Sequence, residues 1–214
     1  DTARRDIVAL DAQGVARRTR GGLVSLNFGH TIPSYSTRLK RFSTQKTKMA
    51  KAALSLIKAG GVYFIDDSTT LLKLSQSIHH PVTVYTHSLD NAIALSVEER
   101  VNLHLFGGKL DHHARFFFEP TMLETLRRIA FDAAFIGATA IAEDGVYFSY
   151  MEDAQVKQAA ALSARQVVVV SETEKFQIQA PYRGLELGQI DTLITDKKLA
   201  QTQKQWFPTK TDFL

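Results

Sequence analysis

The chain has 214 residues, of which 44% are hydrophobic and 22% charged, a composition typical of a globular rather than a disordered protein. Cysteine is absent, which excludes disulfides, thiolate catalysis and zinc–thiolate sites. Residues 1–48 carry ten Lys and Arg against three Asp, whereas residues 49–214 carry sixteen against nineteen Asp and Glu, so the first part suits a polyanionic partner. No apolar run could span a bilayer and no signal-peptide pattern opens the chain. We therefore expect a cytoplasmic protein with no membrane partner.

Basic residues dominate the first predicted elements. Ile7 and Leu10 recur at helical spacing, and Gly14 follows as a stop signal. Residues 15–20 predict a short basic strand that turns at Gly21-Gly22. A helix with arginines near its start, followed by a basic hairpin, suits a helix in the major groove with backbone contacts from a wing. The alternative interpretation is an exposed basic arm.

From residue 44 onward, helical and strand patterns alternate. The predicted order is helix 44–59, strand 62–65, helix 69–78, strand 82–85, helix 88–97, strand 101–106, helix 121–129, strand 133–136, helix 152–165, strand 167–170 and strand 193–194. This alternation indicates an α/β fold with a mostly parallel, doubly wound sheet. In such sheets, ligands bind at the carboxyl ends of the strands.

Small and hydroxyl residues follow several predicted strands. Ser68, Thr69 and Thr70 stand at a helix start, where hydroxyls and backbone N–H groups favour an anion. Lys157 or Lys175 would neutralise that anion, and Lys175 is favoured because it closely follows a buried strand. The dinucleotide and phosphate-loop glycine patterns are missing. A phosphorylated small molecule rich in hydroxyls fits this pattern best.

The histidines and paired acids allow other interpretations. His79-His80 and His112-His113 fall in predicted loops, and adjacent side chains diverge, so we interpret them as surface residues and expect no metal and no cofactor. Asp66 and Asp67 suit either acid–base chemistry or helix capping, and catalysis would need a partner with a matched pKa. We therefore expect a protein that is not an enzyme.

Several motifs resemble the DeoR family of bacterial transcriptional regulators. Thr2-Ala3-Arg4-Arg5-Asp6-Ile7, with Leu10, Gly14, Arg18 and Gly21-Gly22, is similar to the family's recognition helix and wing. The later matches keep the family's order: Arg38, Lys46, residues 66–70, Thr86-His87-Ser88, Gly107-Gly108, Phe135-Ile136-Gly137, Lys157, Lys175-Phe176 and Ile194-Thr195-Asp196. Ser68 replaces a usual glycine, His87 a usual asparagine, and Glu119 stands where glycine is common.

The resemblance implies a partial winged helix-turn-helix over residues 1–24, a linker and the start of the first sensor helix over 25–48, and an effector-sensing domain over 49–214. That domain would be similar to sugar-phosphate isomerases and CoA transferases. Operator DNA would be contacted by Thr2, Arg4, Arg5, Arg17, Arg18 and Arg20. Family members carry another helix pair before this region, so the chain is expected to be a fragment, or to have lost an upstream part, and to bind DNA weakly or not at all.

The function implied is a homo-oligomeric repressor of a sugar or nucleoside catabolic operon, with a phosphorylated sugar as effector. Asp66, His87, Glu119 and Glu152 would bind sugar hydroxyls, and Gly107-Gly108 would leave room for the ligand. The whole expected site is Asp66, Asp67, Ser68, Thr69, Thr70, His87, Ser88, Gly107, Gly108, Glu119, Glu152, Lys157 and Lys175. Two alternatives stay open: a sugar-phosphate isomerase or deaminase on the same fold, and a metabolite-binding module with an incidental basic arm.

Overall fold

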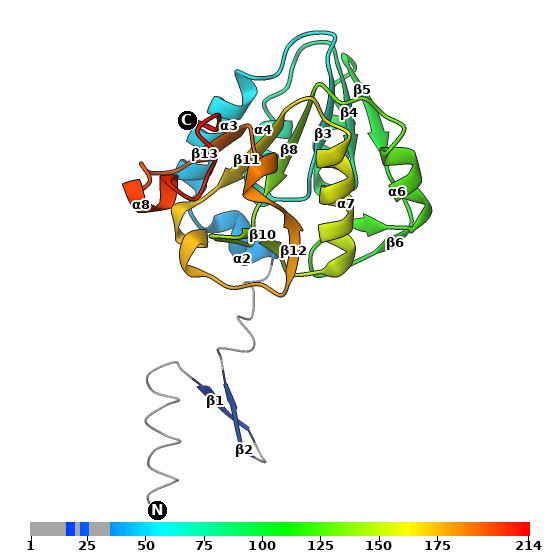
Figure 1. Cartoon of the computed structure of the whole chain (residues 1–214). Coiled ribbons are helices and arrows are strands. Elements are labelled where there is room, and N and C mark those ends of the chain that lie inside the picture. The colour runs from blue at the N-terminus through cyan, green and yellow to red at the C-terminus, as the bar shows by residue number, and fades with distance from the viewer. Residues whose placement is uncertain (1–15, 20–21, 26–34) are drawn as a thin grey trace, which may run out of the picture. The chain divides into compact units, whose positions relative to one another are not determined.

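The computed structural model describes residues 16–19, 22–25 and 35–214, and the chain divides into two compact units, 1–33 and 34–214 (Figure 1). In the first unit, β1 (Ala16–Thr19) and β2 (Gly22–Ser25) form an antiparallel hairpin. The predicted basic hairpin is thereby confirmed. The predicted helix before it, together with Thr2, Arg4, Arg5 and Arg20, lies outside the described residues.

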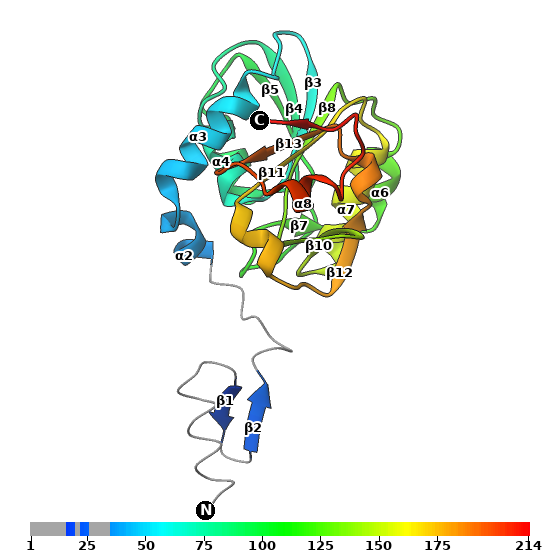
Figure 2. The same ribbon diagram turned by 60° about the vertical axis from the view of Figure 1, so that its left-hand side comes forward.

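A seven-stranded parallel sheet forms the centre of the second unit (Figure 2). Its order is β14-β13-β11-β8-β3-β4-β5, and every neighbouring pair is parallel. The strands are β3 (Val62–Ile65), β4 (Val82–Thr86), β5 (Val101–Leu105), β8 (Ala133–Gly137), β11 (Val167–Ser171), β13 (Thr192–Thr195) and β14 (Asp212–Phe213). The predicted α/β class and all six predicted strands are confirmed. The short strand β14 was not predicted.

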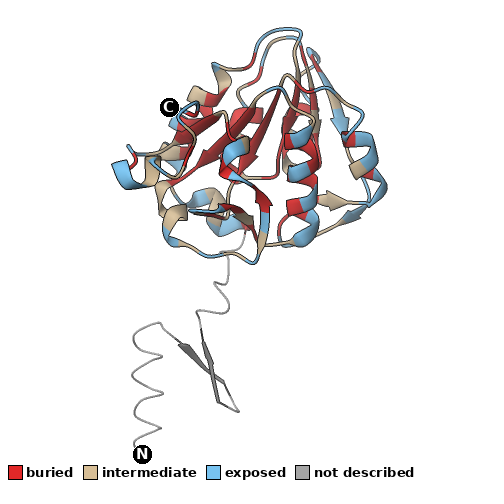
Figure 3. Ribbon diagram, viewed as in Figure 1, coloured by how far each residue is buried: buried red, intermediate tan, exposed pale blue. Residues whose placement is uncertain are grey.

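Helices cover both faces of this sheet (Figure 3). They are α2 (Tyr35–Lys40), α3 (Ser43–Leu54), α4 (Thr69–Ser75), α5 (Leu89–Leu95), α6 (Thr121–Leu126), α7 (Met151–Leu162) and α8 (Gln201–Lys204), with 3₁₀ turns η2 (Thr173–Gln177) and η3 (Leu187–Gln189). Apolar side chains of α3 and α4 pack in one buried cluster, and those of α6 and α7 pack in the other. None of the helices in the described ranges is long and apolar enough to cross a membrane.

Strand β11 is buried on both faces, which requires a layer of helices on each side of the sheet. Val167 and Val169 belong to the α6–α7 cluster, while Val168 and Val170 belong to the α3–α4 cluster. Successive residues of a strand point to opposite faces, so an uninterrupted valine run suits a strand that is buried on both sides. Each fully buried valine contributes about 1.5–3 kcal/mol to folding through removal of apolar surface from water.

The predicted helix 44–59 was too long, because α3 ends at Leu54. The next three backbone N–H groups donate to carbonyls three residues back, from Ser55 to Ala52 (3.2 Å), from Leu56 to Ala53 (3.1 Å) and from Ile57 to Leu54 (3.1 Å). These tighter turns replace the α-helical pattern and bury Ile57. The predicted helix 152–165 likewise ends at Leu162.

Some elements lack a strong sequence pattern and were not predicted. The antiparallel sheet β12-β10-β9 consists of Tyr182–Leu185, Gly145–Phe148 and Ala140–Ala142, and the hairpin β6–β7 pairs Lys109–Leu110 with Phe117–Phe118. Within 25–48, the range predicted as linker and start of the first sensor helix, the structure contains α2 and the first half of α3. The histidine pairs lie in loops as predicted, and His79 Nδ1 is 3.0 Å from Glu98 Oε2.

Candidate functional site

The loop between β3 and α4 is held in place by the buried carboxylate of Asp66. Asp66 Oδ1 accepts a hydrogen bond from Ser68 N (2.8 Å), and Oδ2 accepts one from Gly137 N (2.7 Å). Ser68 then caps α4, because its Oγ accepts from Leu71 N (3.1 Å). The carboxyl ends of β3 and β8 are thus joined through one side chain.

Gly137 is required for this close approach. A Cβ atom at this position would lie 2.4 Å from the Cβ and 2.7 Å from the Oγ of Ser68. Gly137→Ala is therefore expected to push the 66–68 loop from β8 and destabilise the fold by about 1–3 kcal/mol. Urea unfolding measures this change. Gly188→Ala is the matched control, since a Cβ there meets no atom within 4 Å. Equal stability of the two variants would show that the loop can move freely.

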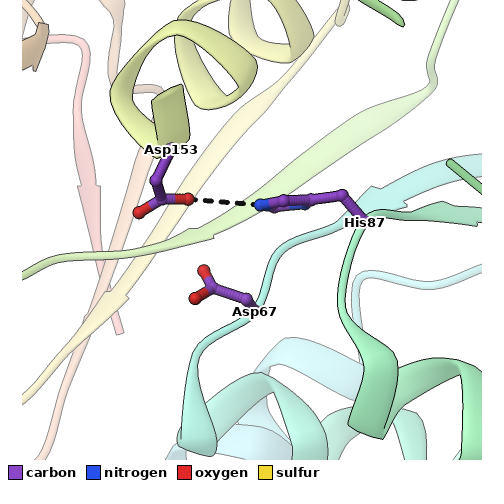
Figure 4. A group of neighbouring side chains, drawn as sticks. All are labelled: Asp67, His87 and Asp153. Atoms are coloured by element: carbon purple, nitrogen blue, oxygen red, sulfur yellow. Dashed lines mark hydrogen bonds and ion pairs between the residues drawn. The ribbon is translucent and has the colours of Figure 1, made fainter. Parts of the chain in front are cut away.

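Lys157 on α7 is the centre of a buried acidic cluster. Its Nζ lies 3.1 Å from Asp66 Oδ2, 3.0 Å from Asp67 Oδ1 and 2.7 Å from Asp153 Oδ2. His87 Nε2 lies 3.2 Å from Asp153 Oδ1, and Figure 4 shows the side chains of Asp67, His87 and Asp153 pointing toward one another from three elements. We call these five residues, Asp66, Asp67, His87, Asp153 and Lys157, the acidic cluster.

The acidic cluster has more negative than positive charge. Burial raises the pKa of Asp66. Burial acts the same way on Asp67, but the charges of Lys157 and Arg38 outweigh it and lower the pKa of that carboxyl. Burial opposes the charge of Lys157, yet the carboxylates of Asp153, Asp66 and Asp67 hold the pKa of its ammonium above the ordinary value. Lys157 is therefore neutralised by its neighbours, and the cluster is better suited to hydroxyl groups than to an anion.

Metal binding is the other chemistry that this geometry allows. One oxygen or nitrogen from each of Asp67, His87 and Asp153 lies within 4.8 Å of the others, a spacing that could hold a metal ion. The ammonium of Lys157 is already 3.0 Å from Asp67 and 2.7 Å from Asp153. It supplies the positive charge that a metal would bring.

A second group of charges lies next to Thr69, and in it the three cations Arg38, Lys46 and Lys175 outnumber the buried carboxylate of Glu172. Lys46 Nζ on α3 donates to Thr69 Oγ1 (2.9 Å) and to the backbone carbonyl of Arg38, and it lies 3.5 Å from Glu172 Oε1. Burial lowers the pKa of Lys46; the carboxylate of Glu172 opposes this shift, and the charges of Lys175 and Arg38 add to it. We call Arg38, Lys46, Thr69 and Lys175 the cationic cluster.

Lys175 belongs to the same electrostatic environment. Burial lowers its pKa; the carboxylates of Glu172 and Glu174 oppose this shift, and the positive charges of Arg38 and Arg41 add to it. Its Nζ lies 3.9 Å from Glu174 Oε1, while Arg41 Nη2 donates to Glu174 Oε2 (2.9 Å). Cations that lower one another's pKa in a partly buried place are stabilised when an anion binds between them.

The other predicted site residues lie outside the two clusters. Ser88 is buried and caps α5 by accepting from Asn91 N (3.2 Å), as predicted, and Thr70 is buried on α4. Gly107 and Gly108 are exposed just before β6, and a Cβ on Gly108 would lie 2.5 Å from the carbonyl oxygen of Phe118. Glu119 and Glu152 are exposed, and no ion pair in the described part of the chain joins either to the two clusters.

Sequence reasoning left several residues out of the site. Lys46 lies on the buried face of α3 with Met49, Ala50 and Ala53, a helical spacing that marks it as an inward-facing lysine. Asp153 precedes Lys157 by one helical turn, the spacing of an ion pair on a helix. No sequence pattern near Glu172 or Arg38 marks them as site residues, because their partners come from other elements.

Together, the fold and the two clusters define an α/β domain with buried charged groups at the carboxyl edge of its sheet, preceded by a separate N-terminal unit. The model for the DeoR C-terminal sensor domain matches residues 41–197, and the model for the DeoR-like helix-turn-helix domain matches residues 1–28. The chain belongs to the DeoR family of transcriptional regulators. This membership makes it a regulator rather than an enzyme, in agreement with the sequence-based expectation.

Several relatives are named as transcriptional repressors. The chain is 37% identical to the HTH-type transcriptional repressor GlcR of Bacillus subtilis, over 92% of this chain and 77% of that protein. It is 29% identical to the lactose phosphotransferase system repressor of Lactococcus lactis, over 100% of this chain and 86% of that protein. It is 30% identical to the glycerol-3-phosphate regulon repressor of Haemophilus influenzae, over 91% of this chain and 76% of that protein.

Solved structures are similar to the chain at low sequence identity. The delta subunit of eIF2B from Chaetomium thermophilum matches with a TM-score of 0.50 and 18% identity, over 75% of this chain and 59% of that chain. Ribose 5-phosphate isomerase A from Methanocaldococcus jannaschii matches with a TM-score of 0.46 and 18% identity, over 63% of this chain and 54% of that chain. The chain thus spans little more than half the length of either structure.

Proposed function

We propose that this chain represses a sugar-related catabolic operon and responds to a phosphorylated sugar bound at the carboxyl edge of its parallel sheet. One observation carries the proposal: the acidic cluster and the cationic cluster meet where β3 leads into α4, with Asp66 and Asp67 in the loop and Thr69 at the first position of the helix. A ligand with a phosphate at one end and hydroxyls at the other is complementary to both.

The phosphate would bind in the cationic cluster. Lys46 and Lys175 would supply charge, and the hydroxyls of Ser68, Thr69 and Thr70 would lie near it. A phosphate dianion accepts several charge-assisted hydrogen bonds, and the cations there repel one another until it binds. The lowered pKa values of Lys46 and Lys175 support this assignment.

The sugar hydroxyls would bind at the acidic cluster. Carboxylates accept hydrogen bonds from hydroxyls, and Lys157 donates to them, so Asp66, Asp67, His87 and Lys157 form a polyol-binding end. Ser88, Gly107, Gly108, Glu119 and Glu152 complete the proposed site at its margin. The names of the relatives support a sugar-related ligand, since one regulates a glycerol-3-phosphate regulon and another a lactose phosphotransferase system.

The N-terminal part would bind operator DNA in the cytoplasm as part of a homo-oligomer. We propose that residues 1–24 belong to the DNA-binding head, that 25–48 connect it and add Lys46 to the effector site, and that 49–214 sense the effector. Arg17 and Arg18 on β1 would contact phosphates, with Thr2, Arg4, Arg5 and Arg20 as further DNA contacts. Paired half-sites require symmetric heads, which is why an oligomer is expected.

A thermal-shift panel tests the effector. We expect one of glucose 6-phosphate, fructose 1-phosphate, ribose 5-phosphate or glycerol 3-phosphate to raise the melting temperature, because a ligand that binds the folded state stabilises it in proportion to its occupancy. The matching unphosphorylated compounds serve as controls. A rise with the free sugars alone, or with none of the compounds, would contradict a sugar-phosphate effector. Turnover of any panel compound would favour the isomerase alternative.

A further inference from the structure

Helix α2 connects the sensor unit to the preceding part of the chain, and its contacts place it beside the cationic cluster. The backbone carbonyl of Arg38 accepts a hydrogen bond from Lys46 Nζ. Tyr35 at the start of α2 is 9% exposed, and the guanidinium carbons of Arg38 and Arg115 lie 5.6 and 5.7 Å from its ring centroid. Arg115 is fixed in turn by two hydrogen bonds to Asp90 (2.6 and 2.8 Å).

The side chain of Arg38 has a hydrogen-bond donor without an acceptor in the part of the chain that the structure describes. Its Nε is buried and has no hydrogen-bond partner among the residues that the structure describes. The hydrogen bond from Lys46 Nζ to the backbone carbonyl of Arg38 places this residue beside the cationic cluster, and its positive charge helps to lower the pKa values of Lys46, Lys175 and Asp67. A buried donor without an acceptor is costly, and two neighbouring lysines add repulsion. An anion placed among these three cations would remove both costs.

We propose that Arg38 binds the phosphate group directly, so that a bound anion fastens α2 to the sensor unit. The inference rests on the proposed phosphate site and adds to it a ligand from the linker and a route for regulation. The anion would join three elements through Arg38 of α2, Lys46 of α3 and Thr69 of α4. The planar guanidinium suits this role because it can donate two parallel hydrogen bonds to phosphate oxygens.

Regulation follows from thermodynamic linkage. If α2 contributes a ligand to the anion, then anion binding must stabilise the docked position of α2 by the same factor by which docking favours the anion. The chain runs from α2 through residues 26–34 to β2 of the N-terminal unit. Occupancy of the sensor would therefore change how firmly the segment next to the DNA-binding head is held.

Substitution of Arg38 tests the contact. We expect Arg38→Gln to weaken the binding of inorganic phosphate and of the panel's best sugar phosphate roughly 10- to 100-fold in calorimetric titrations, the loss expected for a charge-assisted hydrogen bond. Arg38→Lys keeps the positive charge but cannot donate two parallel hydrogen bonds to the phosphate. Its affinity should therefore lie between that of the parent and that of Arg38→Gln. Lys40→Gln removes an equal charge from an exposed position of the same helix and should stay within roughly twofold of the parent.

Hydrogen exchange tests the coupling. We expect the sugar phosphate to slow amide exchange over residues 35–40 in the parent chain and in Lys40→Gln, and not in Arg38→Gln at matched occupancy. Sugar-phosphate binding with unchanged affinity in Arg38→Gln, or with no added protection of α2 in the parent, would overturn this inference and leave the proposed effector site standing. Failure of every sugar phosphate to bind the parent chain would instead remove the proposed function and the inference with it.

Discussion

Lys157→Met is expected to lower the free energy of unfolding by about 3–5 kcal/mol near neutral pH, the cost of leaving buried charges without a partner. The ammonium lies within 3.1 Å of three carboxylates and 4.6 Å from the ring centroid of Phe148, and its side chain is 5% exposed. Methionine fills much of the same volume but cannot donate a hydrogen bond. Asp66, Asp67 and Asp153 would then repel one another with no cation between them.

The stability lost in Lys157→Met should depend on pH. In the parent, the pKa of Asp67 is lowered, so its contribution to stability is present above the unfolded-state value of about 3.9 and is lost as the pH falls through the folded-state pKa. In Lys157→Met the carboxylates lose their cation, so the pKa of Asp66, already raised in the parent, rises further and that of Asp67 rises above the unfolded-state value. The variant therefore gains stability as the pH falls through those raised values. Its deficit relative to the parent should shrink between about pH 7.5 and about pH 5.5.

Urea unfolding at these two pH values measures the effect. Lys51→Met is the matched control, since Lys51 is an exposed lysine on α3, and its change should stay within about 0.5 kcal/mol. The double variant Lys157→Met/Asp153→Asn removes one of the stranded charges and should recover part of the loss. A deficit that is the same at both pH values would show that lost packing, rather than unpaired charge, causes the destabilisation.

The sheet could be predicted from sequence because each strand carries its own signal. The valine run of β11 must be covered on both faces, and Ser68 and Ser88 mark the starts of α4 and α5 by capping them. The small antiparallel strands could not be predicted, because Gly145–Phe148 and Tyr182–Leu185 pair across a long stretch of chain and show no clear alternation. Their structure depends on tertiary contacts rather than on local pattern.

The sequence predicted which edge of the sheet holds the site, but not which side chains contact one another there. Topology brings the ends of β3, β4 and β8 to one edge, so Asp66, Asp67 and His87 could be expected near one another. The partners of Lys157 could not be predicted, because they depend on how far α7 advances over the sheet. Glu119 and Glu152, expected as hydroxyl ligands, are exposed in the structure, and their role in the site remains a prediction.

Lys46→Met is expected to act on binding more than on stability. Lys46 donates to Thr69 Oγ1 and to the carbonyl of Arg38, so it links the proposed phosphate site to α2. Its loss should weaken sugar-phosphate binding roughly 100-fold, since a charge-assisted hydrogen bond and a buried cation both disappear. The stability cost should be smaller than for Lys157→Met. Glu172 loses a partner, but the repulsion between Lys46 and the charges of Lys175 and Arg38 is relieved.

The same lysine, together with Lys175, is expected to set the alkaline limit of binding in the parent chain. Burial and the charges of Lys175 and Arg38 lower the pKa of Lys46, so it loses its proton at a lower pH than an ordinary lysine. Because the anion needs the protonated form, affinity should fall as the pH rises toward that lowered pKa, and calorimetric titrations up to about pH 10 measure the decline. Lys48→Met, which changes an exposed lysine of the same helix, should bind like the parent. Affinity that is unchanged in Lys46→Met and flat with pH would place the phosphate elsewhere on the sheet edge.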